Sequence, residues 1–255
     1  MKIRLLLILF VLCLACNPRK AETLPNQLTE QQKSEGWKLL FDGQTTKGWR
    51  IYKNKENDTW EVSEGTLHCK ALGDSIGTKR ADLMTIDEYG SFELLFDWKI
   101  AAGANSGLIY RVTEEFEVPY GSGPEYQIID DTGYPGDLMP VNTTAANYDM
   151  QAPQNNKLNP VGEWNSGKIV VNENHVEHWL NGVKVVEYEL GSEAWKKQVA
   201  GCKWKDFPGY GLAKTGYIDL QDHGHEIWFR NIYIKTLKNQ YEVTGLLQIH
   251  SRFEI

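Results

Sequence analysis

Short runs of apolar or alternating residues, separated by Gly, Asn, Asp and Pro, follow one another along most of this chain. Runs of this kind are typical of β-strands, and a long series of them predicts an all-β sandwich or barrel. Only residues 192–200 look helical, with Ser192 as N-cap and Gly201 as the stop. The predicted strands lie at residues 37–41, 58–63, 65–70, 81–86, 91–100, 107–112, 125–130, 167–172, 174–180, 183–190, 216–222 and 226–235.

Two turn signals join three of these strands. The polar tripeptide at 172–174 and the dipeptide Asn181-Gly182 interrupt an otherwise strand-like segment between residues 168 and 190. Asn-Gly favours the positive φ angles of a two-residue hairpin turn. We therefore expect a meander of three consecutive antiparallel strands in this segment.

Two predicted strands carry polar faces. Side chains alternate between the faces of a strand, so segments 125–130 and 216–223 each have one apolar and one polar face. The expected buried residues are Tyr126, Ile128, Ile218 and Leu220. The expected residues of the polar faces are Glu125, Gln127, Asp219, Gln221 and His223. Carboxylates, amides and an imidazole at alternate positions suit the binding of a polar ligand such as a sugar.

Composition narrows the kinds of partner. The 255 residues are 41% apolar, enough for one substantial core without requiring two. The formal net charge is -7 and no Lys/Arg run occurs, which argues against nucleic acid. We therefore expect a small polar or neutral ligand. Cys69 and Cys202 form either one disulfide or two free thiols.

The N-terminus has the pattern of an export signal. Basic residues precede an apolar run over residues 5–15, about half of the roughly 20 residues that a membrane-spanning helix needs. Cys16 resembles the acylated cysteine of bacterial lipoproteins, although Cys13 stands where Leu is usual. We expect a signal peptide at 1–15, a lipid anchor on Cys16, and a periplasmic or outer-membrane location in the bacterial cell envelope. Simple secretion and a retained anchor are the alternatives.

Three further segments have no strand pattern. Residues 16–34 are polar and are expected to be a tether to a single domain at 35–237. Residues 131–163 are rich in Gly, Pro and Asn and exceed the usual connection length, so they form either an ordered functional rim or a disordered insert. Residues 238–255 are a C-terminal extension that adds an edge strand or docks elsewhere.

The strand at 125–130 lacks the acid pair of an ordinary retaining glycosidase, which holds two carboxyl groups about 5 Å apart. Ile129 stands four residues after Glu125, and Gln127 stands two residues after it. Asp130 falls on the opposite face of a regular strand. We therefore do not expect a double-displacement mechanism.

Segment 103–111 offers two more candidates. Asn105 is either part of a tight bend before the strand or a ligand contact. Arg111 is either an exposed ion-pair partner or a charged donor for an oxyanion in the same bowl as Asn105.

His223 has three interpretations. It is in phase with Asp219 and Gln221 and suits a general base near neutral pH. It also suits a metal ligand with Glu125 or Asp219, so a divalent metal stays open as a cofactor. The third interpretation is a histidine that is only hydrogen-bonded at a strand end. Among the tryptophans, Trp204 in a lysine-flanked loop is the best candidate for stacking on a sugar.

Several short motifs occur in order between Trp37 and Leu237. They are Leu40-Phe41-Asp42-Gly43, Gly48-Trp49, Asn105-Ser106-Gly107, Tyr110-Arg111, Glu125-Tyr126-Gln127, Tyr148, Glu163-Trp164-Asn165, Trp179-Leu180-Asn181-Gly182, Leu220-Gln221-Asp222-His223-Gly224 and Phe229-Arg230-Asn231-Ile232. Together they resemble the 3-keto-disaccharide hydrolase domain family. The resemblance implies a concanavalin-A-like jelly roll, related to glucanases, of two antiparallel sheets with a concave sugar-binding face.

The resemblance also implies cleavage, by hydrolysis or elimination, of glycosides oxidised at C3 by a separate upstream oxidoreductase. A C3 ketone acidifies the C2 proton, so one base can start the cleavage without a glycosyl-enzyme. The residues expected to be catalytic are Glu125, His223 and Arg111. The residues expected to bind substrate are Asn105, Gln127, Asp130, Tyr148, Trp204 and Gln221.

Two other classes of protein remain open. A carbohydrate-binding module would use the same bowl without turnover, although binding alone favours aromatic platforms over titratable groups. An interaction module of a surface complex would make the polar faces incidental. The sequence leaves open the sugar, its linkage, and which of Glu125 and His223 is the base.

Overall fold

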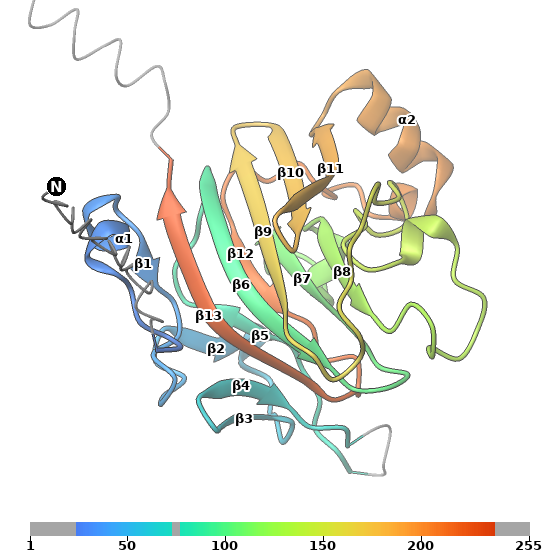
Figure 1. The fold of residues 1–255 in the computed structure, drawn as a ribbon. Coiled ribbons are helices and arrows are strands. Elements are labelled where there is room, and N and C mark those ends of the chain that lie inside the picture. The colour runs from blue at the N-terminus through green and yellow to red at the C-terminus, as the bar shows by residue number, and fades with distance from the viewer. Residues whose placement is uncertain (1–23, 73–76, 238–255) are drawn as a thin grey trace, which may run out of the picture.

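The computed structural model describes residues 24–72 and 77–237, which fold into two antiparallel β-sheets packed face to face (Figure 1). This confirms the predicted all-β sandwich and is the arrangement that a concanavalin-A-like jelly roll requires. Within these residues, no helix has the length and apolar character to cross a membrane.

The larger sheet has eight strands, in the order β11-β10-β9-β6-β13-β4-β3, and β1 also pairs with β13. Its strands are β1 (Lys38–Leu39), β3 (Trp60–Ser63), β4 (Thr66–Cys69), β6 (Phe92–Ile100), β9 (Asn165–Asn172), β10 (His175–Leu180), β11 (Val183–Glu189) and β13 (Ile227–Thr236). The expected meander is present as β9, β10 and β11, and Asn181 and Gly182 have φ angles of 47° and 81°.

The smaller sheet has five strands, in the order β2-β5-β12-β7-β8. They are β2 (Trp49–Ile51), β5 (Leu83–Thr85), β7 (Asn105–Val112), β8 (Glu125–Ile129) and β12 (Tyr217–Leu220). The hydrophobic pattern missed β2, because three residues are too few to show a period.

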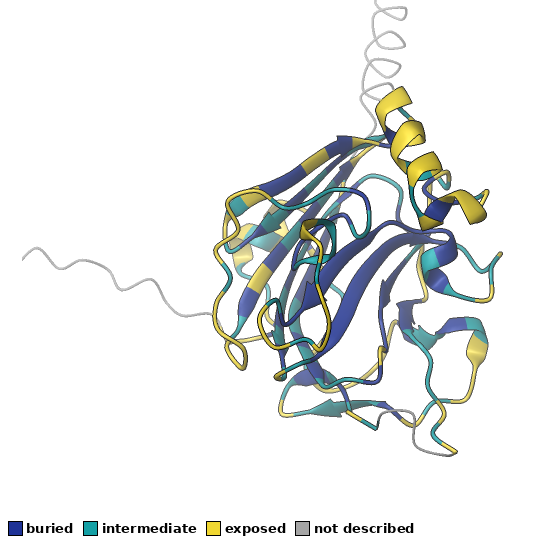
Figure 2. Ribbon diagram, turned by 90° about the vertical axis from the view of Figure 1, so that its right-hand side faces the viewer, coloured by how far each residue is buried: buried dark blue, intermediate teal, exposed yellow. Residues whose placement is uncertain are grey.

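The core lies between the sheets. Along β6 every second residue is buried, from Phe92 to Ile100. From the smaller sheet, the four residues predicted to be buried, Tyr126, Ile128, Ile218 and Leu220, are all 0% exposed and belong to the same core. Figure 2 shows the buried strands at the centre of the molecule.

The predicted helix is α2 (Glu193–Gly201), and the Ser192 side chain accepts a hydrogen bond from Trp195 N. Trp195 is its only buried residue and Val199 is half-buried, while most of the other residues of the helix are exposed (Figure 2). The chain also contains short 3-10 turns, at η1 (Tyr52–Asn54), η2 (Pro119–Gly121), η3 (Pro140–Asn142) and η4 (Lys203–Asp206).

The expected tether begins to fold earlier than predicted. Helix α1 (Glu30–Ser34) has a capping box at Thr29. Asn26 is 7% exposed, and its side chain donates to Gly65 O at 2.8 Å. Part of the expected tether at 16–34 therefore packs against the domain expected at 35–237. The predicted signal peptide, Cys16 and the extension at 238–255 lie outside the described residues.

Two open alternatives are resolved. Cys69 and Cys202 are free thiols. The segment 131–163 is an ordered rim, because it lies along β8 through backbone hydrogen bonds. Gln127 and residues 145–146 exchange two of them, and Tyr148 N donates to Glu125 O at 3.1 Å.

Candidate functional site

Three adjacent strands bring the predicted polar residues together on the outer face of the smaller sheet. Ile109 of β7 pairs with Glu125 of β8 on one side and with Asp219 of β12 on the other. In the next row, Gly107 pairs with Gln127, and Gly107 O accepts a hydrogen bond from Gln221 N at 3.0 Å. The polar side chains therefore surround a central position that has no side chain.

Gly107 leaves the space that Glu125 occupies. A Cβ atom at Gly107 would lie 2.1 Å from Glu125 Oε1, closer than any real contact. The carboxylate therefore lies across β7, toward Gln221, and a glycine inside a strand marks this close approach.

These residues line a cavity of about 360 Å³. Its lining consists of Asn105, Tyr120, Glu125, Gln127, Tyr148, Lys203, Trp204, Phe207, Gln221 and His223. The structure thus confirms that one bowl is lined by Glu125, Gln127, Gln221 and His223. Asn105, Tyr148 and Trp204 lie there as predicted, and the roles of all seven remain predictions.

The aromatic wall comes from the rim and from η4. Trp204 is 1% exposed, stacks on Tyr210 with ring centroids 4.4 Å apart, and donates from Nε1 to Tyr148 O at 3.2 Å. Lys203 Nζ lies 4.1 Å from the ring centroid of Tyr148 and 4.5 Å from that of Trp204. Trp204 is therefore a fixed wall more than an open stacking platform.

Glu125 is 3% exposed, and burial raises its pKa to about 8; Asp82 adds to the increase and the positive charge of Lys203 opposes it. Its carboxyl group is therefore mostly protonated at neutral pH. His223 lies beyond the end of β12, and part of its surface is exposed. The buried part of its imidazole and the neighbouring His225 lower its pKa. Its imidazole is therefore mostly neutral at the same pH.

A pair of acidic residues, Asp82 and Asp219, lies beside this site. Asp219 is fully buried, its carboxyl lies against that of Asp82, and within the described residues no N–H or other O–H donor reaches either of its oxygens. Burial raises both pKa values, that of Asp82 to about 7. Among the described residues, Asp219 accepts no hydrogen bond from an N–H group and Asp82 accepts one, from a backbone N–H, so the two adjacent carboxyl groups are stable when they share a proton.

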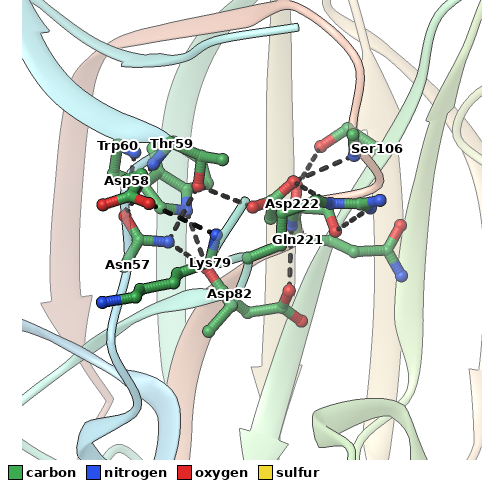
Figure 3. Close-up of polar contacts among 12 residues, drawn as sticks. Asn57, Asp58, Thr59, Trp60, Lys79, Asp82, Ser106, Gln221 and Asp222 are labelled. Atoms are coloured by element: carbon green, nitrogen blue, oxygen red, sulfur yellow. Dashed lines mark hydrogen bonds and ion pairs between the residues drawn. The ribbon is translucent and has the colours of Figure 1, made fainter. Parts of the chain in front are cut away.

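A second cavity, of about 250 Å³, adjoins the first and shares Tyr120, Gln221 and His223 with it. Asp222 organises its wall, accepting from Thr59 Oγ1 at 2.6 Å and donating from its backbone N to Asp82 Oδ1 at 2.9 Å (Figure 3). Arg80 also donates to Asp222 and lines this cavity.

Arg111 was expected in the bowl, and this prediction is wrong. Arg111 has a left-handed backbone, with φ 55°, which breaks the alternation of β7 and turns Val112 to the face of Ile109. Its guanidinium donates instead to the carbonyl oxygens of Gly90 and Glu173. Arg111 therefore connects loops away from the cavity.

Asp130 was expected to bind substrate, and the structure gives it another role. Its carboxylate accepts backbone hydrogen bonds from Gly103 at 2.8 Å, Thr132 at 3.0 Å and Gly133 at 2.8 Å. It is not among the residues that line the cavity. Asp130 holds the turn that follows β8.

Sequence reasoning missed Lys203, Tyr120 and Phe207. All three lie in or beside short 3-10 turns, where no hydrophobic period indicates the direction of a side chain. The only signal was the position of Lys203 next to Trp204.

A metal site does not fit the cavity. Among the described residues, the group of three His or acidic ligand atoms within 4.8 Å of one another is His175, Glu177 and Glu187, on β10 and β11. Lys184 already pairs with both glutamates. Glu125 and His223 belong to no such group among the described residues.

The fold and the cavity define a carbohydrate-active type of protein: a β-sandwich with a hollow lined by carboxyl, amide, imidazole and aromatic groups. The chain belongs to the 3-keto-alpha-glucoside-1,2-lyase-like domain family, whose model matches residues 36–235. This confirms the family resemblance.

Two relatives illustrate the similarity. The 3-keto-disaccharide hydrolase of Bacteroides thetaiotaomicron is 32% identical over 232 residues, covering 80% of this chain and 79% of the relative. A crystal structure from Parabacteroides distasonis, of a protein to which glycosyl hydrolase activity is ascribed, is 38% identical with a TM-score of 0.78. It covers 84% of this chain and 100% of that chain.

Proposed function

We propose that the protein cleaves 3-keto-glycosides, including 3-keto-disaccharides, by removal of the C2 proton and expulsion of the C1 substituent. The observation that carries this proposal is the pair of Glu125 and His223 in one cavity, with opposite pKa shifts. Family membership and the similarity to a 3-keto-disaccharide hydrolase support the substrate class.

The protonation states assign the two roles. A general base that works at neutral pH must be unprotonated, and a general acid must be protonated. The neutral imidazole of His223 therefore takes the C2 proton, and the carboxyl of Glu125 gives a proton to the departing C1 oxygen. The electrons of the C2–H bond form the C1=C2 bond, and water addition to this product completes a net hydrolysis.

The two adjoining cavities support a substrate with two rings. The 3-keto ring fits the cavity that contains Glu125, and the leaving group fits the cavity that contains Arg80 and Asp82. Gln221 and His223 border both cavities, so they lie where the glycosidic bond would cross. A binding module is less well supported, because Trp204 is buried against other rings.

Supply of the substrate requires a second activity. A ketone at C3 arises by oxidation of a sugar alcohol, so an oxidoreductase acting on C3 must precede this protein. A lipid anchor on Cys16 would place the cleavage in the cell envelope.

The test is release of 4-nitrophenol from 4-nitrophenyl 3-keto-glucoside, beside 4-nitrophenyl glucoside and a protein-free control for spontaneous cleavage. We expect release from the ketone alone, because only the ketone acidifies the C2 proton. Comparable release from the unoxidised glucoside would refute the mechanism, and release from neither compound would refute the function.

A further inference from the structure

Removal of the C2 proton places negative charge on the C3 oxygen, and the cavity must stabilise this charge. The sequence offered Arg111 for that purpose, but its guanidinium binds the carbonyl oxygens of Gly90 and Glu173 elsewhere. Among the ten described residues that line the cavity, Lys203 is the one lysine and no arginine is present. A cation for the C3 oxygen therefore has to be sought at Lys203.

The position of Lys203 is fixed by aromatic rings. It is the first residue of η4, directly before Trp204, whose ring stacks on Tyr210. Its Nζ lies over the rings of Tyr148 and Trp204, at 4.1 Å and 4.5 Å from their centroids. Ring faces hold an ammonium group by its charge and leave N–H donors for another partner.

The ammonium group also makes no direct ion pair with a described residue: burial lowers the pKa of Lys203, and the charges of Glu125 and Asp149 oppose this from farther away. Lys203 takes part in no ion pair within 4 Å among residues 24–72 and 77–237. Glu125 is the acidic residue that lines the same cavity, and it is mostly protonated at neutral pH. The positive charge of Lys203 is therefore available to a ligand.

We propose that Lys203 binds the C3 carbonyl oxygen of the substrate and stabilises the enolate by charge and hydrogen bonding, without a covalent bond. As His223 takes the C2 proton, the C2–H electrons form the C2=C3 bond, and the π electrons of C3=O move onto the oxygen, which becomes an oxyanion beside Nζ. The C3 carbonyl then reforms, C1=C2 forms, and the C1–O bond breaks with a proton from Glu125. This role rests on the proposed function.

The experiment compares Lys203→Met, Lys203→Arg and the neighbouring Lys205→Met with the native protein on 4-nitrophenyl 3-keto-glucoside. Removal of one oxyanion donor typically costs 10²–10³-fold in kcat. We expect a loss of about this size in Lys203→Met, partial recovery in Lys203→Arg, and less than about a two-fold change in Lys205→Met. Exchange of the C2 proton for deuterium, followed by NMR, should fall in parallel with kcat while the circular-dichroism spectrum and melting temperature stay native-like, which a purely structural role would not produce.

Three results would overturn the proposal. Native-like kcat in a folded Lys203→Met protein refutes it while the proposed function stands, whereas an inactive native protein overturns both. Trapping with borohydride distinguishes a covalent role: we expect no reduced adduct, and substrate mass on Lys203 would replace the ammonium role by a Schiff base.

Discussion

Glu125 shows how burial changes the chemistry of one side chain. An exposed glutamate is ionised at neutral pH, but burial on the floor of the cavity raises the pKa of Glu125 to about 8. His223, at the exposed end of the same bowl, has a lowered pKa. The two groups are therefore in the protonation states that an acid and a base need, without any rearrangement.

The first prediction is a bell-shaped pH dependence of kcat/KM. The rate should rise with pH as His223 loses its proton below about 6.5, and it should fall through about pH 8 as Glu125 ionises. Glu125→Gln replaces the carboxyl group by an amide of similar size that cannot transfer a proton, so kcat should fall about 10²–10⁴-fold, and the alkaline decrease should disappear.

The contrary outcome for this pH profile is a rate that increases through pH 8. That result would make the ionised Glu125 the base, and the proton for the leaving group would come from another donor, because His223 is neutral in this range. A pH-independent stability of the protein over the same range, followed by circular dichroism, is the control.

Some residues of the site were predictable and others were not. Glu125, Gln127 and Gln221 follow from a period of two along regular strands. Arg111 does not, because a left-handed residue reverses the alternation and no local sequence rule announces it. Lys203 lies in a 3-10 turn, where its direction depends on tertiary contacts with aromatic rings.

At the scale of elements, β7 determines the shape of the site. It lies between β8 and β12, so whatever side chain stands at its centre would separate their polar groups. Gly107 stands there, and the hollow above it receives the Glu125 carboxylate. The strand predicted at 107–112 thus supplies the floor of the cavity, although its central glycine was not predicted to matter.

The second prediction concerns Gly107→Ala. The new methyl group would meet the flexible end of Glu125 at 2.1 Å, so the carboxylate should move while the fold stays intact. We expect kcat to fall about 10²-fold, because such a displacement is enough to misplace a catalytic group. The melting temperature should change little.

Gly167→Ala in β9 is the matched control for Gly107→Ala. Its methyl group would lie 2.3 Å from the ring of Phe96 in the core, so overpacking should cost about 1–3 kcal/mol of stability. Activity per folded molecule should be unchanged. If Gly107→Ala lost stability and kept its kcat, Glu125 would not need this position.

At the scale of the whole molecule, the order and type of most elements were predictable, because alternation and turn residues define strands locally. The division into two sheets was predictable only as a class, since the pairing of β6 with β13 joins distant residues. Helix α1 was missed because its Thr29 cap stabilises a single short turn within a polar segment. The two adjoining cavities depend on loops that carry no periodic signal.

The third prediction concerns location. If Cys16 carries a lipid, the native protein should partition into detergent with the membrane fraction, whereas Cys16→Ala should remain unprocessed or soluble. Cys13→Ala is the control and should behave like the native protein. Unchanged partitioning of Cys16→Ala would exclude the anchor; these residues lie outside the described part of the chain.

The position of β13 has a consequence for the order of folding. This strand, residues 227–236, lies between β6 and β4 in the eight-stranded sheet and also pairs with β1, so Lys38 lies opposite Ile234. A chain that emerges from the ribosome presents β1, β4 and β6 long before the strand that joins them. The larger sheet cannot close until almost the entire domain has been made, because pairings this distant in sequence form late and slowly. During synthesis the larger sheet therefore stays incomplete, with the edges of β4 and β6 unpaired, until residues 227–236 appear.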